Sequence, residues 1–368
     1  MSKYQYFIEY FEQFTRVIQL LWVISGFFMI TVLVLISYLK MLRSYLRKEE
    51  EKTTKYEKEY ELSLLTYLFS GNEVDEMSKT IQQLIIDQLK TCSIDKLKRK
   101  ILVSLLVKLK KDISGEMSES INKLYSQTGL IGYGIAQLKS NQWHFVVKGI
   151  RELSQFHSIE VYNEIFNIRN HSNREIRKEV QLYLVSLFNF KGLVFLDDLK
   201  TPLSEWDQIQ LLDELHRGET QEIPNITPWL RSENKSVVFF ALKLAKTYNQ
   251  FDVKNTLIDL LLHKNKEVRI QVILTLGHLN IVASKEILKR NFNQSSQEEQ
   301  VVFFKIFENL YDNNDESFLL EHIRHKNFDI KLKALSMLKK FSIDTFKNIE
   351  VLPTDIAYAK IFKFVENN

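Results

Sequence analysis

The C-terminal two-thirds of the chain repeats one pattern of polar and apolar positions. In its clearest copy, Asn265 stands three residues before Val268, and Val272 and Leu276 follow four and eight residues after Val268. This spacing places the three apolar side chains on one face of a helix. An Asn three residues before the first buried position occupies the place of a helix N-cap. The pattern therefore predicts a capped helix with one buried face.

The same pattern returns at a regular interval. Three more copies keep the Asn, two degenerate copies have Ser in its place, and an earlier copy begins with Gln. These copies are Asn173, Ile176, Val180, Leu184; Asn234, Val237, Ala241, Ala245; Asn327, Ile330, Ala334, Leu338; Ser204, Leu211, Leu215; Ser296, Phe303, Phe307; and Gln142, Phe145, Gly149, Leu153. Positions 176, 237, 268 and 330 differ by 61, 31 and 62, so the period is near 31 residues. Each repeat is expected to hold helix A, a turn with Asn or Ser, and helix B, stacked as an α-solenoid over residues 129–368.

A second pattern is a run of 23 residues, Val17 to Leu39, that contains no charged side chain. As a helix this run would extend about 35 Å, which is enough to cross a hydrocarbon core of roughly 30 Å. A cleaved signal peptide is the alternative, but the run is too long and no small-residue cleavage site follows it. A buried core helix is a weaker alternative, because nothing nearby has matching all-round hydrophobicity. We therefore predict a single transmembrane helix at residues 17–39.

The residues around this run predict its orientation. Residues 1–16 place aromatic side chains at helical spacing, which indicates an amphipathic helix at a membrane surface or, alternatively, a loosely packed terminus. Basic residues are more frequent after the run than before it, and the positive-inside rule then places the N-terminus outside and the C-terminal domain in the cytoplasm. The basic residues that follow the run are Lys40, Arg43, Arg47 and Lys48.

Two further segments connect the run to the repeats. Residues 40–61 alternate charges of both signs at helical distances, which predicts a solvated helical stalk. Residues 62–128 predict helices without the repeated pattern, and we interpret them as an N-terminal cap on the stack. Within them Lys98, Arg99 and Lys100, together with the basic residues after the run, form a candidate lipid-facing patch, with an ordinary solvated face as the alternative. Residues 63 to the end are expected to fold in water.

Composition narrows the functional classes. Gly (10) and Pro (4) are scarce among 368 residues, which favours an all-α fold with long helices. The net charge of +4 is too small to predict a nucleic-acid partner. Cys92 is the only cysteine, so the chain has no internal disulfide. The eight histidines include no His-Glu-x-x-His motif, and we expect no metal, no cofactor and no catalytic residues.

The segment from Leu261 to Leu279 resembles a HEAT-type (armadillo-type) repeat of the short bacterial kind. In that family an Asp usually stands in the turn and a Val-Arg pair opens helix B. Here Asn replaces the Asp, and the Arg is kept at Arg177 and Arg269 but becomes Lys331 and Val238 in other copies. The layout of span, stalk and stack resembles bacterial membrane-anchored HEAT-repeat proteins. The resemblance implies a bacterial inner-membrane protein whose solenoid binds other proteins.

Two functional classes stay open at this point. The first is a non-catalytic membrane-anchored scaffold that binds a protein partner in a groove lined by helices B. The second is an enzyme or an accessory subunit of a membrane-associated pathway, for example beside a glycosyltransferase, or a lyase of the HEAT-like kind. Helix B positions outside the apolar stripe predict the groove, with Phe240 and Phe239 alternatively packing in the core. The candidate groove residues are Phe240, Arg269, Gln271 and Lys331.

Overall fold

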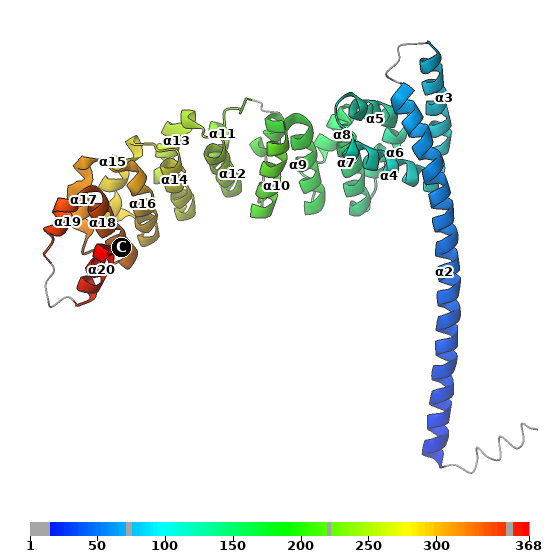
Figure 1. Ribbon diagram of the computed structural model, residues 1–368, viewed down its shortest axis with the longest axis horizontal. Helices are drawn as coiled ribbons and strands as arrows, with labels where there is room; N and C mark the ends of the chain where they lie inside the picture. The colour runs from blue at the N-terminus through cyan, green and yellow to red at the C-terminus, as the bar shows by residue number, and fades with distance from the viewer. Residues whose placement is uncertain (1–14, 71–75, 219–221, 351–355, 368) are drawn as a thin grey trace, which may run out of the picture. The chain divides into compact units, whose positions relative to one another are not determined.

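The computed structural model describes residues 15–70, 76–218, 222–350 and 356–367, apart from the side chain of Gln19. In these ranges the protein is all α-helical, with 19 α-helices, α2 to α20, and short 3-10 helices between several of them (Figure 1). The chain forms two compact units, one of residues up to 139 with 155–158 and one of residues 140–154 with 159–368. The amphipathic helix predicted at residues 1–16 lies, up to residue 14, outside the described residues.

The first unit begins with one long helix, α2 (Arg16–Ser70), of 55 residues (Figure 1). Its apolar half has a mean hydropathy of 2.5 and none of it is buried, so its length and composition suit a membrane anchor or a signal sequence. The segment Arg174–Asp197 is also long and apolar, but 61% of it is buried, as expected for a core helix. The predicted stalk at residues 40–61 is the continuation of α2, and it is exposed or half-exposed except at Tyr60.

The C-terminal end of α2 packs against the other helices of the first unit. These are α3 (Glu76–Cys92), α4 (Lys96–Asp112), α5 (Glu116–Gln127) and α6 (Leu130–Leu138). The fully buried residues of this core include Tyr60, Leu64, Leu89, Leu102, Leu106 and Leu124. Tyr60 precedes the predicted start of the cap, so a fragment beginning at residue 63 would lack a core side chain. Leu84 of α3 is by contrast 66% exposed.

The second unit is a series of capped helices B separated by shorter segments. Helices B are α7 (Trp143–Gln155), α9 (Arg174–Phe188), α10 (Glu205–Arg217), α12 (Lys235–Thr247), α14 (Lys266–His278), α16 (Gln297–Leu310) and α18 (Phe328–Phe341). Helix α9 packs on α10. Further along the chain, α12 packs on α14, α14 on α16, and α16 on α18. The structure is therefore that of a helical repeat solenoid.

Helices A are short and partly 3-10, because a period near 31 residues leaves little chain for them. They are α8 (Tyr162–Asn167), η2 (Asn189–Asp197), α11 (Thr227–Leu230), α13 (Lys254–Asp259) with η4 (Leu260–Leu262), α15 (Ala283–Arg290) and α17 (Glu316–His322). The unit ends with α19 (Ile343–Lys347) and α20 (Ile356–Asn367). Asp312 caps the 3-10 helix η6 (Asn313–Asp315), which precedes α17.

The predicted apolar stripes of the six Asn and Ser copies are buried. In the copy of α14, Val268, Val272 and Leu276 are fully inaccessible to solvent. In the earlier copy Gly149 and Leu153 are buried as predicted, but Phe145 is 43% exposed and the next residue, Val146, is buried instead. A shift of one residue rotates a helix by about 100°, which is enough to exchange a core position for a surface one.

The turn before each helix B from α9 onward provides a side-chain N-cap, as the sequence pattern predicted. The side-chain oxygen of Asn265 accepts hydrogen bonds from the backbone nitrogens of Glu267 (2.9 Å) and Val268 (3.2 Å). Asn173, Asn234 and Asn327 cap their helices in the same way. Ser204 and Ser296 form capping boxes with Asp207 and Glu299, which explains why these two copies tolerate an acid at the first buried position.

We predict that Asn265→Ala and Asn327→Ala each destabilise the protein by about 1 kcal/mol, because two helix N–H groups lose their acceptor. Thermal unfolding of the detergent-solubilised protein, followed by circular dichroism, should show a midpoint lower by a few degrees for each. Asn293→Ala is the matched control, since Asn293 is exposed in the short helix η5 (Phe292–Gln294). Equal midpoints for all three variants and the parent would contradict the capping role.

Candidate functional site

Arg269, a predicted groove residue, closes the turn of its own repeat. Its Nη1 donates to the backbone oxygen of His263 at 2.8 Å, and its Nε donates to Oε1 of Glu299 at 2.6 Å. Arg177 donates to the turn oxygens of His171 and Ser172 in the same way. The Val-Arg pair thus holds turns and neighbouring repeats together, and the Arg269 guanidinium is not free to bind a partner.

Ion pairs of this kind recur along the turn side of the helices. Each joins a basic side chain near the start of one helix B, or within it, to an acid near the start of the next. They are Arg151–Glu179, Arg174–Asp207, Lys235–Glu267, Lys266–Glu298 and Arg269–Glu299. Acids also suit this end because helix N-termini carry a partial positive charge.

Glu299 is the most buried carboxylate in this series. Burial alone would raise its pKa, but hydrogen bonds from Arg269 and Ser296 outweigh burial and hold the pKa of Glu299 below its usual value. A lowered folded-state pKa means that the pair stabilises the fold above the unfolded pKa of Glu, about 4.3, and loses this effect as the pH falls through the folded pKa.

The remaining predicted groove residues lie in different surroundings. Phe240 is fully buried in the core of α12, so this residue does not line a surface, and its neighbour Phe239 is half-exposed instead. Gln271 is exposed on α14 as predicted. Lys331 is half-exposed on α18, which packs on α16 and not on α14 in the contacts between helices, so the structure does not bring Lys331 beside Gln271.

A groove of about 320 Å³ does lie across helices α10, α12 and α14. Its apolar wall consists of Phe239, Leu242 and Ile270. The polar lining residues are Glu205, Gln208, Lys243, Lys246, Glu267, Gln271 and Thr275. Gln271 is the one residue predicted from sequence that belongs to this groove. Phe239 was singled out only as a neighbour of Phe240, and Lys243 and Lys246 were missed.

Gln208 contributes a buried side-chain amide to the lining of the groove. Its side chain is 98% buried, and its Nε2 donates to the backbone oxygen of Leu203 at 3.2 Å. Its Oε1 has no hydrogen-bond partner among the described residues. A buried acceptor without a partner is costly, so this oxygen is a candidate contact for a donor supplied by a ligand.

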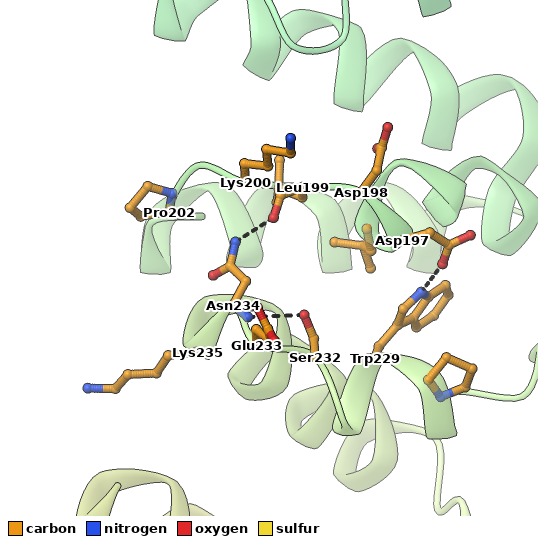
Figure 2. Close-up of a pocket in the computed structure, with 12 residues that line it drawn as sticks. Asp197, Asp198, Leu199, Lys200, Pro202, Trp229, Ser232, Glu233, Asn234 and Lys235 are labelled. Atoms are coloured by element: carbon orange, nitrogen blue, oxygen red, sulfur yellow. Dashed lines mark hydrogen bonds between the residues drawn. The ribbon is translucent and has the colours of Figure 1, made fainter.

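A larger pocket, of about 810 Å³, lies at the turn side between η2 and the start of α12 (Figure 2). Several of its polar groups form hydrogen bonds or ion pairs with other side chains or with the backbone. Trp229 Nε1 donates to Asp197 at 2.7 Å, and Nδ2 of Asn234 donates to the backbone oxygen of Leu199 at 2.8 Å, as Figure 2 shows. Asp198 pairs with Arg169 at 2.6 Å. These contacts fix the turn, so we assign this pocket a structural role.

The predicted lipid-facing patch is only partly available. Lys98 lies 5.0 Å from the ring centre of Tyr56, and Arg99 lies 3.8 Å from that of Tyr133. Both cations therefore cover aromatic rings of the first unit. The other members of the patch, Lys40, Arg43, Arg47, Lys48 and Lys100, are exposed.

Two buried cationic clusters escaped the sequence reading, because their partners come from distant parts of the chain. Lys285 is 2% exposed and binds Asp315 at 2.8 Å, and Lys289 binds the same carboxylate at 2.7 Å. In the first unit, burial lowers the pKa of Lys110 to about 8, and its ammonium donates to the backbone oxygen of Gln155 at 2.6 Å. Both clusters join helices and lie outside the groove.

The described residues hold no group of three or more His, Cys, Asp or Glu side chains placed to bind a metal ion.

Among solved structures the chain is similar to two engineered proteins, Northeast Structural Genomics Consortium targets OR329 and OR497. The first is 11% identical over 71% of this chain and 97% of its own, with a TM-score of 0.23. The second is 12% identical over 82% and 88%, with a TM-score of 0.29. Similarity at this level adds nothing to the helix packing described above.

The sequence matches no protein-family model and no curated protein.

We predict that Arg269→Gln destabilises the protein by about 2–3 kcal/mol at neutral pH, because it leaves the buried Glu299 carboxylate unpaired. The difference from the parent should narrow as the pH falls below the unfolded pKa of Glu, about 4.3, and through the lowered folded-state pKa of Glu299. Thermal unfolding measured from pH 7 down to pH 3 tests both points. The matched control is Arg231→Gln, since Arg231 is exposed and meets Asp259 at only 3.6 Å. A difference that stays constant with pH would contradict the role of the ion pair.

Proposed function

We propose that this protein is a membrane-anchored, non-catalytic scaffold whose helical repeats bind a segment of another protein. The observation that carries the proposal is the groove across α10, α12 and α14. It combines a half-exposed aromatic side chain, Phe239, with polar side chains that form no ion pair between repeats among the described residues, Lys243, Lys246 and Gln271. Apolar grooves between helices with a few polar groups are common binding sites for protein segments.

The exposed first half of α2 supports the anchor. Phe27 is 67% exposed and Met29 is 68% exposed, so no part of the protein within the described ranges covers these side chains. A lipid bilayer covers such a surface at no cost in buried polar groups. The flanking basic residues then favour an N-terminus outside and repeats in the cytoplasm. The bacterial inner membrane is proposed from the resemblance of the layout alone.

The second class of function, an enzyme or accessory subunit, gains no support from the described residues. The groove holds carboxylates from Glu205 and Glu267, and the latter is paired with Lys235. Hydrogen bonding by Lys235 lowers the pKa of Glu267, which makes it a weak general base. The groove lining contains no Ser, Cys or His, and its one hydroxyl, that of Thr275, donates to the backbone oxygen of Gln271 at 2.8 Å.

We predict that a cytoplasm-active reporter fused after residue 368 is active, because the basic residues after the apolar run stay on the cytoplasmic side. A periplasm-active reporter at the same position should be silent, and alkaline carbonate should leave the protein in the membrane fraction. Activity of the periplasmic reporter would contradict the orientation, and release by carbonate would contradict the anchor.

We also predict that a photo-crosslinking amino acid at Gln271 captures one protein in intact cells, because Gln271 lies in the groove lining. The matched control is the same amino acid at Leu262, which is 80% exposed in η4 and outside the groove lining. Adding Phe239→Ser should abolish the adduct at position 271. Adducts that form equally at both positions, or that persist with Phe239→Ser, would contradict the groove as the binding site.

A further inference from the structure

One position recurs on the open side of the helices B. It lies five residues after each cap residue, and it is apolar from α10 onward. The side chains are Ile209, Phe239, Ile270, Val301 and Leu332. Ile209 is 51% exposed, Phe239 and Ile270 line the groove, and the last two are half-exposed. The helices therefore present a row of apolar side chains, one for each repeat, that are not buried in the protein's own core.

The spacing of this row suits a regular peptide. Helices α12, α14, α16 and α18 pack in succession. Packed helices lie about 8–10 Å apart, so the members of the row on these four helices are separated by about that distance. A helical segment advances about 10.5 Å in seven residues, so apolar residues seven apart on a bound helix meet successive members. The row thus matches the apolar face of an amphipathic helix laid across the helices B.

The charges beside the row are not symmetrical. Lys243 is half-exposed and Lys246 is exposed, both line the groove, and neither forms an ion pair among the described side chains. Of the two acids in the lining, Glu267 is paired with Lys235, whereas Glu205 forms no ion pair among the described side chains. The lining therefore holds two unpaired lysines and one unpaired acid. Two lysines three residues apart on one helix repel each other, so their placement gains nothing for the helix itself.

We infer that the groove across α10, α12 and α14 binds an acidic amphipathic segment of a partner protein. Apolar side chains of that segment cover Phe239 and Ile270, and its carboxylates meet Lys243 and Lys246. The buried Oε1 of Gln208 accepts a hydrogen bond from the segment. This inference rests on the proposed scaffold function and adds the chemistry of the partner to it. It follows from charge complementarity and from the apolar row.

Two synthetic peptides test the inference on the full-length protein in bilayer discs of neutral lipid. One carries Leu at every seventh position with Glu on the flanking positions, and the other has Lys in place of each Glu. Fluorescence anisotropy measures the affinity of each, with empty discs as the blank. We expect the acidic peptide to bind about tenfold more tightly than the basic one.

The variant Lys243→Glu with Lys246→Glu should reverse this preference. The matched control is Lys254→Glu with Lys264→Glu, two exposed lysines outside the groove lining, and it should keep the preference of the parent. Circular dichroism checks that both variants keep the helical signal. Equal binding of the two peptides, binding of neither, or an unchanged preference in the Lys243→Glu, Lys246→Glu variant overturns the inference. Capture from position 271 that persists in that case shows that the proposed function stands without it.

Discussion

The repeats depend on hydrogen-bond acceptors for the first backbone N–H groups of each helix B, which the preceding turn supplies. The first N–H groups of a helix have no acceptor within the helix, and a stack of short helices exposes such groups once in every repeat. Asn173 and Asn265 each accept hydrogen bonds from two of these N–H groups, and Ser204 accepts one. Arg177 of α9 and Arg269 of α14 donate to the backbone carbonyls of the turn. Because Arg269 also binds Glu299, the same side chain that closes one turn joins it to the next repeat.

This arrangement places the contacts that hold the repeats together on the turn side and in the core. The side chains on the open face of the helices B are then left without structural partners, as Lys243, Lys246 and Gln271 show. The groove is the place where that face is hollowed. Sequence changes on this face can therefore alter a binding function and leave the turns intact.

Much of the fold could be predicted from the sequence, because its signals are local. A cap residue and apolar positions at four and eight residues define each helix B without any knowledge of its neighbours. The functional face was predicted less well. Phe240 and Phe239 are adjacent, and one residue of rotation decides which of them is buried, so the pattern alone did not separate them. Arg269 required the position of Glu299 in the following repeat.

Other features were out of reach for the same reason. Lys285 and Asp315 are 30 residues apart, and only the packing of neighbouring repeats brings them within hydrogen-bond distance. The role of Tyr60 depended on where α2 meets α3 and α4, and the charged sequence before it reads as solvated stalk. The caps and stripes were predictable because they are properties of single helices, whereas the pairs between repeats are properties of the stack.

The most direct measurement of the central claim is the solvent accessibility of the groove in the membrane. A cysteine is placed at Gln271, and separately at Leu262, in a Cys92→Ser background, and is labelled with a polar maleimide in inverted membrane vesicles and in purified protein. If the open face of the helices B is the binding surface, the cysteine at position 271 reacts several-fold more slowly in the vesicles, and the one at position 262 reacts equally in both. Equal labelling of position 271 in vesicles and in purified protein would contradict the account.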